Sequence, residues 1–188
     1  MNIAKGENRG YLKIKSAASA FNFDFRGKVV LDIGSSTGGF TDYALERGAL
    51  KVIAVEKGTK QMMAPLRFDP RVELHEKMDI FEFVPAVLPD VIVVDVSFIS
   101  LTKVLMYAKM ELTRSDTQFL VMLKPQFEAG KEQLNKGVVK NEKMRREIVR
   151  DFENWLKRTG FVILNKRDNE LAGKTGNVER FYQLALAK

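Results

Sequence analysis

The sequence predicts an α/β fold in which a mostly parallel, seven-stranded sheet is covered by helices on both faces. Short apolar, β-branched runs alternate with longer segments of helical period, which is typical of such a sheet. Two runs, VIVVDV and FLVMLK, are apolar almost throughout, as strands buried on both faces should be. At 188 residues, the chain fits one domain with a sizeable core.

Each element can be placed by its residue range. The expected strands are residues 28–33, 51–56, 72–74, 90–96, 118–123, 161–167 and 181–187, and the expected helices are residues 12–21, 39–47, 60–67, 101–109 and 141–158. The last helix is the clearest, because Asn141 can cap it, Gly160 follows its end and its apolar residues form one stripe. Residues 124–140 have no strong period and are long for a connection, which is typical of a functional loop. We expect residues 1–24 to form a basic segment with a short helix, and residues 25–188 to form the main domain.

Composition excludes several classes of protein. Hydrophobic residues make up 45% and charged residues 29%, which indicates a globular chain and not a disordered one. The start of the sequence is polar and basic, so we expect no secretory signal there, and no run approaches the ~20 apolar residues that span a bilayer. Cysteine is absent, which excludes disulfides and suits a reducing compartment. We therefore expect a cytoplasmic protein with no membrane partner and no metal.

The chain is basic, with 31 Lys and Arg against 24 Asp and Glu, a net charge of +7. Such a balance is the footprint of a nucleic-acid binder, although a well-solvated surface is the alternative. The positive charges gather near the N-terminus and again within residues 131–150. The candidate RNA contacts are Arg9, Lys15, Lys131, Lys136 and Lys140.

A glycine-rich loop follows the first expected strand. Residues 34–39 read G-S-S-T-G-G, whereas a dinucleotide site needs G-x-G-x-x-G and would have glycine in place of Ser36. Asp32 would sit badly beside a pyrophosphate but suits a ligand that carries an ammonium group. A tight turn without any ligand is the alternative interpretation.

Two further acidic residues narrow the choice of ligand. Glu56 ends the second strand, where it can accept hydrogen bonds from both ribose hydroxyls, and Asp79 lies where an adenine contact is expected. S-adenosylmethionine has the ammonium, the ribose and the adenine, and it has no phosphate. The predicted cofactor contacts are Asp32, Gly34, Ser35, Ser36, Thr37, Gly38, Gly39, Phe40, Glu56, Asp79 and Asp95.

Charged residues close two neighbouring strands at the edge where α/β sheets bind ligands. Asp95 follows VIVV and Lys124 follows FLVML, while Glu179 stands near the start of the last strand. Each residue alone could be a solvated strand end. Two of them beside a ligand loop favour a catalytic site.

The segments LDIGSSTGGFTD, VVDVSFISL, LKPQFEAG and GNVERF identify a resemblance. Over nearly its full length, the chain resembles the TlyA (haemolysin-like) branch of the FtsJ-type ribosomal RNA methyltransferases. The resemblance implies a Rossmann-like class I methyltransferase fold with an antiparallel last strand, and methylation of a ribose 2′-hydroxyl of ribosomal RNA. Members commonly carry an S4-type RNA-binding domain ahead of this part, and the sequence contains no such domain.

The resemblance also implies a catalytic tetrad of Lys13, Asp95, Lys124 and Glu179. Lys13 lies in RGYLKIK, where the family more often reads S-R-G-G-L-K, so that Asn8 and Tyr11 depart from the pattern. Such a tetrad suits the chemistry, because a free lysine with a pKa near ~10.4 is mostly protonated and a second cation nearby favours its neutral form. Lys124 could then accept the hydroxyl proton as a general base.

Three other functions remain open at the level of sequence. The first is a non-catalytic RNA-binding or ribosome-assembly factor that keeps this fold. The second is an NAD-dependent oxidoreductase, against which the glycine spacing argues. The third is a membrane-active haemolysin, against which the absence of a signal or an apolar helix argues.

Overall fold

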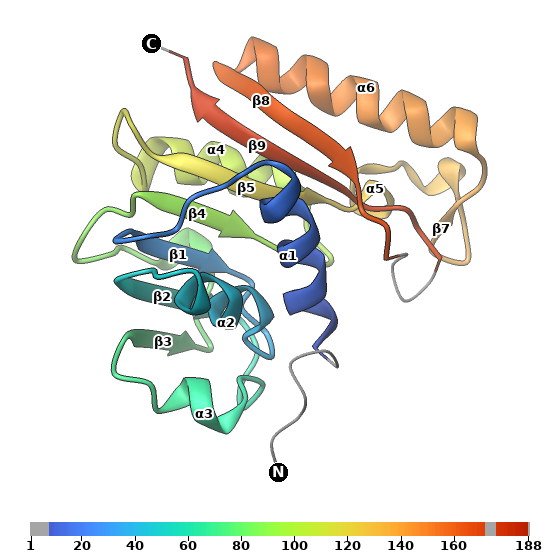
Figure 1. Ribbon diagram of the computed structural model, residues 1–188. Helices are drawn as coiled ribbons and strands as arrows, with labels where there is room; N and C mark the ends of the chain where they lie inside the picture. Colours follow the sequence, from blue (N-terminus) through green and yellow to red (C-terminus); the bar gives the residue numbers. More distant parts are fainter. Residues whose placement is uncertain (1–7, 172–175, 188) are drawn as a thin grey trace.

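The fold is known from a computed structural model in which residues 8–171 and 176–187 are described. A seven-stranded sheet forms its centre, with the strand order β3-β2-β1-β4-β5-β9-β8 (Figure 1). The strands are β1 (Val29–Ile33), β2 (Lys51–Glu56), β3 (Val72–Glu76), β4 (Val91–Val94), β5 (Gln118–Leu123), β8 (Phe161–Asp168) and β9 (Arg180–Leu186). The first five are parallel, and β9 runs antiparallel to both β5 and β8. The expected fold class is confirmed.

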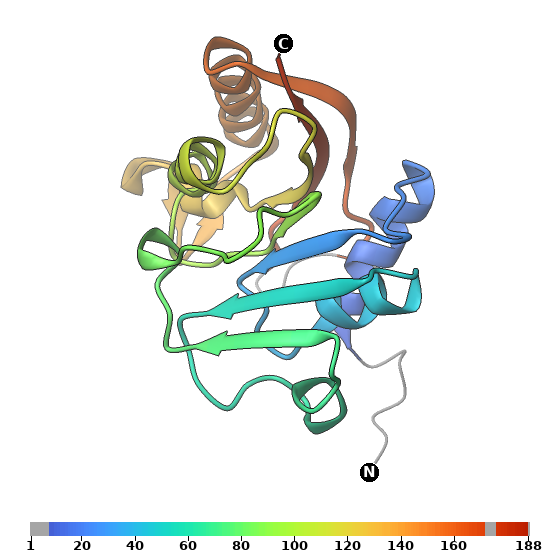
Figure 2. The same cartoon turned by 90° about the vertical axis from the view of Figure 1, so that its left-hand side faces the viewer.

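Helices cover both faces of this sheet, as Figure 2 shows from the side. The helices are α1 (Arg9–Ala20), α2 (Gly39–Glu46), α3 (Ala64–Arg67), α4 (Leu101–Glu111), α5 (Pro125–Glu128) and α6 (Glu142–Arg158). Helices α1 and α2 cover one face, while α4 and α6 cover the other. Two apolar cores result, one on each side of the sheet.

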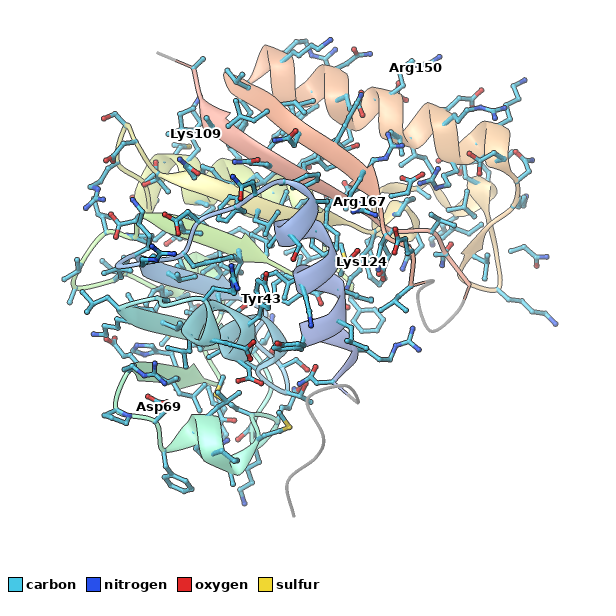
Figure 3. All side chains as sticks on the ribbon, viewed as in Figure 1. Tyr43, Asp69, Lys109, Lys124, Arg150 and Arg167 are labelled. Atoms are coloured by element: carbon cyan, nitrogen blue, oxygen red, sulfur yellow. The ribbon has the colours of Figure 1, made fainter. Side chains whose placement is uncertain are left out.

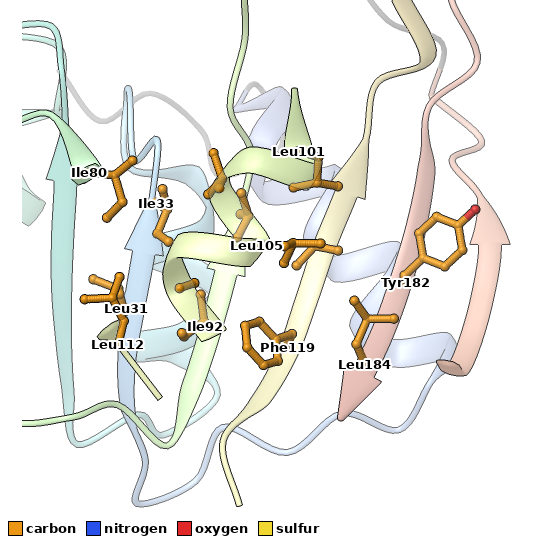
Figure 4. Packing of buried hydrophobic residues seen from close by; sticks show 14 of the residues in the cluster. Leu31, Ile33, Ile80, Ile92, Leu101, Leu105, Leu112, Phe119, Tyr182 and Leu184 are labelled. Atoms are coloured by element: carbon orange, nitrogen blue, oxygen red, sulfur yellow. The ribbon is translucent and has the colours of Figure 1, made fainter. Parts of the chain in front are cut away.

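The core beneath α4 and α6 is drawn in Figure 4, where Leu105 of α4 lies over Phe119 of β5 and Leu184 of β9. All three residues are fully buried. The second core includes Ile14 of α1 and Phe40 of α2. Helix α1 therefore packs as part of the same body as the sheet, through apolar residues spaced along one of its faces.

Several predicted bounds differ from those observed. The expected helix 60–67 is only α3, because Lys60 has a positive φ of 55° and Pro65 is suited to the first turn of a helix. Helix α1 begins earlier than expected, at Arg9, because the Asn8 side chain accepts a hydrogen bond from the Tyr11 N–H and caps it. Strand β4 ends at Val94, which is two residues earlier than expected.

Residues 124–140, expected to be a loop, contain α5 and a small hairpin. Its strands are β6 (Leu134–Asn135) and β7 (Val138–Val139), joined by Lys136 and Gly137 with φ of 48° and 80°. Two successive positive φ values are typical of the tight turns that join hairpin strands. Within residues 8–171 and 176–187, no helix combines the length and apolar character that crossing a membrane requires.

Candidate active site

Four segments meet at one edge of the sheet. The glycine loop follows β1, Asp95 follows β4 and Lys124 follows β5, so that the ends of three parallel strands supply them. Strand β9 runs the other way, with Arg180 paired to Leu123, and its start therefore brings Glu179 to the same edge. Helix α1 runs alongside and adds Lys13. Figure 3 shows Lys124 beside α1 at this edge.

The four charged residues form two ion pairs. The Lys13 Nζ lies 2.5 Å from the Glu179 Oε2, and the Lys124 Nζ lies 2.6 Å from the Asp95 Oδ1. Lys124 also donates a hydrogen bond to the Ser97 hydroxyl at 2.9 Å. The lysine side chains are only 10% and 11% exposed, so both ammonium groups are held largely out of water. Interactions of this kind are much less screened than those at the surface.

A single cavity of ≈ 920 Å³ is lined by all four of these residues. The glycine loop forms another part of its wall, through Gly34, Ser35, Ser36, Thr37, Gly39 and Phe40. Its size is at the upper end of the range for small-molecule sites, which suits a cofactor together with part of a second substrate. The predicted catalytic residues and the predicted loop residues other than Gly38 thus line one cavity.

The glycines of the loop have separate reasons to be there. Gly34 has φ of 82°, and a Cβ at this position would lie 2.7 Å from the Asp95 carbonyl oxygen. Gly39 has no such backbone constraint, but a Cβ there would lie 2.5 Å from the Tyr11 nitrogen of α1. The absence of a side chain at Gly39 therefore allows α1 to approach α2 and hold Lys13 over the cavity.

Asp32 lies behind the loop and does not line the cavity. It is fully buried and accepts a hydrogen bond from the Thr41 hydroxyl at 2.6 Å. Burial raises the pKa of Asp32 to about 7. Its Oδ1 and the buried hydroxyl of Ser35 have no hydrogen-bond partner among the described residues.

Glu56 and Asp79 lie outside the cavity wall. The Glu56 carboxylate accepts hydrogen bonds from the Ser36 N–H at 2.9 Å and the Gly58 N–H at 2.6 Å, so it braces the loop against β2. Asp79 accepts a hydrogen bond from the Phe81 N–H and forms an ion pair with Lys57 at 2.9 Å. Both sit at the sheet edge that carries the loop, as predicted, but neither side chain reaches the cavity.

The predicted RNA contacts are exposed and lie at different distances from the cavity. Arg9 lines it, and the Lys15 ammonium lies 5.9 Å from the centre of the Tyr11 ring. Lys136 is in the hairpin turn next to Gly137, which also lines the cavity. The other two predicted contacts, Lys131 and Lys140, do not line it; Lys140 donates a hydrogen bond to the Glu132 carbonyl oxygen.

The sequence reasoning missed two aromatic residues of the site. Phe98 is 93% exposed, with a positive φ of 65°, and its ring centre lies 5.2 Å from that of Phe127. Both rings line the cavity, as do Ser97 and Gln126. An aromatic residue four positions after the end of an apolar strand, in VSFIS and again in KPQFE, was the available signal.

Asn169 was also missed, because its role depends on tertiary contacts. Its buried amide donates hydrogen bonds to the Glu179 Oε2 at 3.3 Å and to the Leu171 carbonyl oxygen at 2.8 Å.

The two residues that depart from the family pattern, Asn8 and Tyr11, have structural roles of their own. Asn8 caps α1, and the Tyr11 ring packs edge-on against Tyr43 at 5.5 Å.

Comparison with known families decides the assignment of the chain. Residues 7–186 match the family described as FtsJ-like methyltransferase. The chain belongs to the FtsJ-like methyltransferase family. Nearly the whole chain falls within that match, including the glycine loop and the two lysine–carboxylate pairs of the cavity.

Curated relatives support this membership. The chain is 37% identical to "23S rRNA (cytidine-2'-O)-methyltransferase TlyA" of Campylobacter jejuni, over 93% of this chain and 69% of that protein. It is 36% identical to "16S/23S rRNA (cytidine-2'-O)-methyltransferase TlyA" of Mycobacterium tuberculosis, over 94% of this chain and 67% of that protein. A protein named "Hemolysin A" from Brachyspira hyodysenteriae is also 36% identical, over 89% of this chain and 71% of that protein. The chain spans about two thirds of the length of these FtsJ-like relatives.

Solved structures agree. A "Putative hemolysin" from Streptococcus thermophilus superposes with a TM-score of 0.91 at 34% identity, covering 97% of this chain and 67% of that chain. A "putative RNA methyltransferase" from Pyrococcus horikoshii superposes with a TM-score of 0.65 at 18% identity, covering 95% and 83%. The likeness to the Pyrococcus horikoshii protein shows a shared fold and nothing more.

Proposed function

We propose that this chain transfers a methyl group from S-adenosylmethionine to a ribose 2′-hydroxyl of ribosomal RNA. The observation that carries the proposal is two lysine–carboxylate contacts, one buried and one half-buried, that face one cavity beside a glycine loop. Homologues with the same fold are named for this reaction on 16S and 23S ribosomal RNA. Fold alone would not support the reaction, since one fold hosts many chemistries.

The residues around the glycine loop fit S-adenosylmethionine. The Ser35 hydroxyl and the Asp32 Oδ1 are buried polar atoms without a partner among the described residues, so the loop region can still form hydrogen bonds. Asp95 and Glu179 are each paired with a lysine at the cavity, so its wall carries charges of both signs. The loop has Ser36 where a pyrophosphate site has its second glycine, which disfavours a dinucleotide. When bound, S-adenosylmethionine supplies an electrophilic methyl group.

Lys124 is the residue best placed to withdraw the hydroxyl proton. In its neutral form the Lys124 amine accepts the proton of the 2′-hydroxyl, and Asp95, 2.6 Å away, stabilises the ammonium that forms. Lys13 and Glu179 form the second pair at the same cavity. The proton therefore moves from the ribose oxygen to the Lys124 Nζ as the methyl group is accepted by that oxygen.

The surface around the cavity suits an RNA strand with an exposed base. Phe98 presents its ring to solvent beside Lys124, and unstacked bases in RNA recognition commonly stack on aromatic side chains. We infer that Phe98 and Phe127 support the base whose ribose is methylated. The basic residues Arg9, Lys15, Lys131, Lys136 and Lys140 would contact phosphates around it.

Replacement of Lys124 tests the proposal. Lys124→Ala should lower the rate of methyl transfer to ribosomal RNA or subunits by ~10²–10⁴-fold, since positioned general bases contribute about that much. Lys124→Arg should fail as well, because arginine stays protonated and cannot accept the proton. The measurement is mass mapping of 2′-O-methylated nucleotides, with S-adenosylmethionine affinity followed by calorimetry.

Lys103→Ala is the matched control, because Lys103 is an exposed lysine on α4 that does not line the cavity. It should methylate at the wild-type rate. Equal rates for wild type and Lys124→Ala would contradict the proposed role of Lys124. No methylation of any ribosomal substrate by the wild type, with RNA binding intact, would favour a non-catalytic RNA-binding factor instead.

A further inference from the structure

Glu128, at the end of α5, makes two strong contacts that the proposed reaction does not use. Its Oε1 accepts a hydrogen bond from the Leu101 N–H and its Oε2 accepts one from the Ser100 hydroxyl, both at 2.6 Å. Ser100 is the N-cap of α4, so the carboxylate lies at the N-terminus of an 11-residue helix. Burial raises the pKa of Glu128, while the hydrogen bonds from Ser100 and Leu101 favour its ionised form. Glu128 does not line the cavity.

These contacts are the outermost of a series that joins two loops. The loop after β4 and the segment after β5 meet first at the Asp95–Lys124 ion pair and at the bond from Lys124 to Ser97. The rings of Phe98 and Phe127 meet next, at 5.2 Å. Glu128 closes the series beyond them. One wall of the cavity thus consists of two segments held in register at both ends.

The backbone conformation of Phe98 explains why the loop after β4 needs the contacts with Glu128. Its φ of 65° lies in the left-handed region, which is unfavourable for a residue with a bulky side chain. Such a conformation persists only where surrounding contacts enforce it. The ring itself is 93% exposed and receives little support from burial. Asp95 and Ser97 are tied to Lys124 on one side of Phe98, and Ser100 and Leu101 are tied to Glu128 on the other.

We propose that Glu128 is a positioning residue, which holds the loop after β4 against α5 so that the Phe98 ring and the Lys124 amine face the same nucleotide. The inference rests on the proposed function, since it assigns the aromatic pair to the base and Lys124 to its ribose. It predicts a defect in the use of RNA and none in the binding of S-adenosylmethionine, because Glu128 holds the far end of the loop after β4, at Ser100 and Leu101, whereas the glycine loop meets the beginning of that loop beside Asp95.

Steady-state kinetics of Glu128→Ala and Glu128→Gln test this role. Glu128→Ala should lower kcat by about 10²-fold, because misplacing reacting groups by about 1 Å has effects of that size. It should also raise KM for RNA, while the Kd for S-adenosylmethionine stays at the wild-type value. Glu128→Gln should restore most of the activity, because its amide oxygen can accept from Leu101 and its NH₂ group can donate to the Ser100 hydroxyl.

Glu111→Ala is the control, since Glu111 is an exposed carboxylate at the other end of α4. It should behave as the wild type. Wild-type kcat and KM for RNA in Glu128→Ala would overturn the inference. Loss of S-adenosylmethionine binding together with activity would overturn it as well, because Glu128 would then support the fold as a whole.

A second measurement is independent of catalysis. The double variant Phe98→Trp, Trp155→Phe removes the only native tryptophan and places a single fluorescent tryptophan at position 98. Adding Glu128→Ala should lower the fluorescence anisotropy of the introduced tryptophan, and adding Glu128→Gln should not. An unchanged anisotropy in Glu128→Ala would contradict the inference, whether or not the wild type methylates a ribosomal substrate. Absence of methylation by the wild type would contradict the proposed function alone.

Discussion

At the scale of single residues, Asn169 links the strand β8 to the carboxylate of Glu179. Its amide donates to the same Glu179 oxygen that the Lys13 ammonium contacts, and a second bond to the Leu171 carbonyl oxygen fixes the amide itself. Asn169→Ala removes this donor from a buried site, so the Glu179 carboxylate should turn more freely. We expect kcat for methyl transfer to fall by about tenfold or more, with KM unchanged for both substrates. Steady-state kinetics check this prediction.

Asn165→Ala is the control for that experiment. Asn165 is an exposed amide on the same strand, and it donates a hydrogen bond to the Gln183 side chain. Its replacement should leave kcat at the wild-type value. A comparable loss in both variants would mean that β8 tolerates no change and that Asn169 has no special role.

Asp32 should make the stability of the fold depend on pH. Burial raises its pKa from 3.8 to about 7. Between these two pH values, Asp32 is therefore protonated in the folded chain and ionised in the unfolded chain. Stability from this residue is therefore greatest near pH 4 and is lost as pH rises through 7. Asp32→Asn carries no such charge. Between pH 5 and pH 8, the free energy of unfolding of the wild type should therefore fall relative to that of Asp32→Asn, by on the order of 1 kcal/mol or more.

Denaturant unfolding of both proteins at several pH values measures that difference. Only the change with pH is diagnostic, since the amide alters the hydrogen bond to Thr41 at every pH. A constant difference between the two proteins from pH 5 to pH 8 would show that Asp32 titrates near its ordinary value.

At the scale of elements, the contact between α1 and α2 depends on Gly39. A Cβ there would lie 2.5 Å from both the Tyr11 nitrogen and the Asn8 Oδ1, so α1 must move away in Gly39→Ala. Lys13 moves with it and separates from Glu179. We expect a lower melting temperature and a loss of methyl transfer of at least about tenfold.

Gly130→Ala serves for comparison, and thermal unfolding with activity assays distinguishes the two variants. A Cβ at Gly130 would meet only the end of the flexible Glu132 side chain, which can turn away. Its effect on both measurements should therefore be small. If Gly39→Ala melts and methylates like Gly130→Ala, close approach of α1 is not needed to place Lys13.

The elements show which features a sequence can predict. Strands β2 and β5 were predicted to the residue, because burial on both faces leaves a continuous apolar run such as FLVML. The hairpin of β6 and β7 was missed, since strands of two residues have no period to detect. The structure brings together the predicted residues that follow strand ends, as with Asp95 and Lys124. Phe98 and Glu128 escaped prediction because their roles depend on contacts between two loops.

At the scale of the whole molecule, the net charge of +7 should appear in the binding of RNA. Each phosphate contact contributes roughly 0.7–0.9 to the slope of log affinity against log salt. The double variant Lys136→Glu, Lys140→Glu should therefore bind RNA more weakly and reduce that slope by about 1.4–1.8. S-adenosylmethionine affinity should stay unchanged.

The control is Lys103→Glu, Lys157→Glu, which makes the same change in net charge on α4 and α6. Fluorescence titrations at several salt concentrations compare the two double variants. Equal slopes would mean that total charge, and not the face around the hairpin, determines binding.

The place of β9 inside the sheet determines when the chain can complete its fold during synthesis. This strand comes last among the described elements, yet it lies inside the sheet, paired to β5 on one side and β8 on the other. A nascent chain that ends before residue 179 leaves the apolar edge of β5 open to pairing with other strands. It also leaves Lys13 without the carboxylate of Glu179. The ribosome that makes this chain must therefore translate beyond β9 before the proposed site can form, so a nascent chain that still lacks this strand cannot methylate RNA.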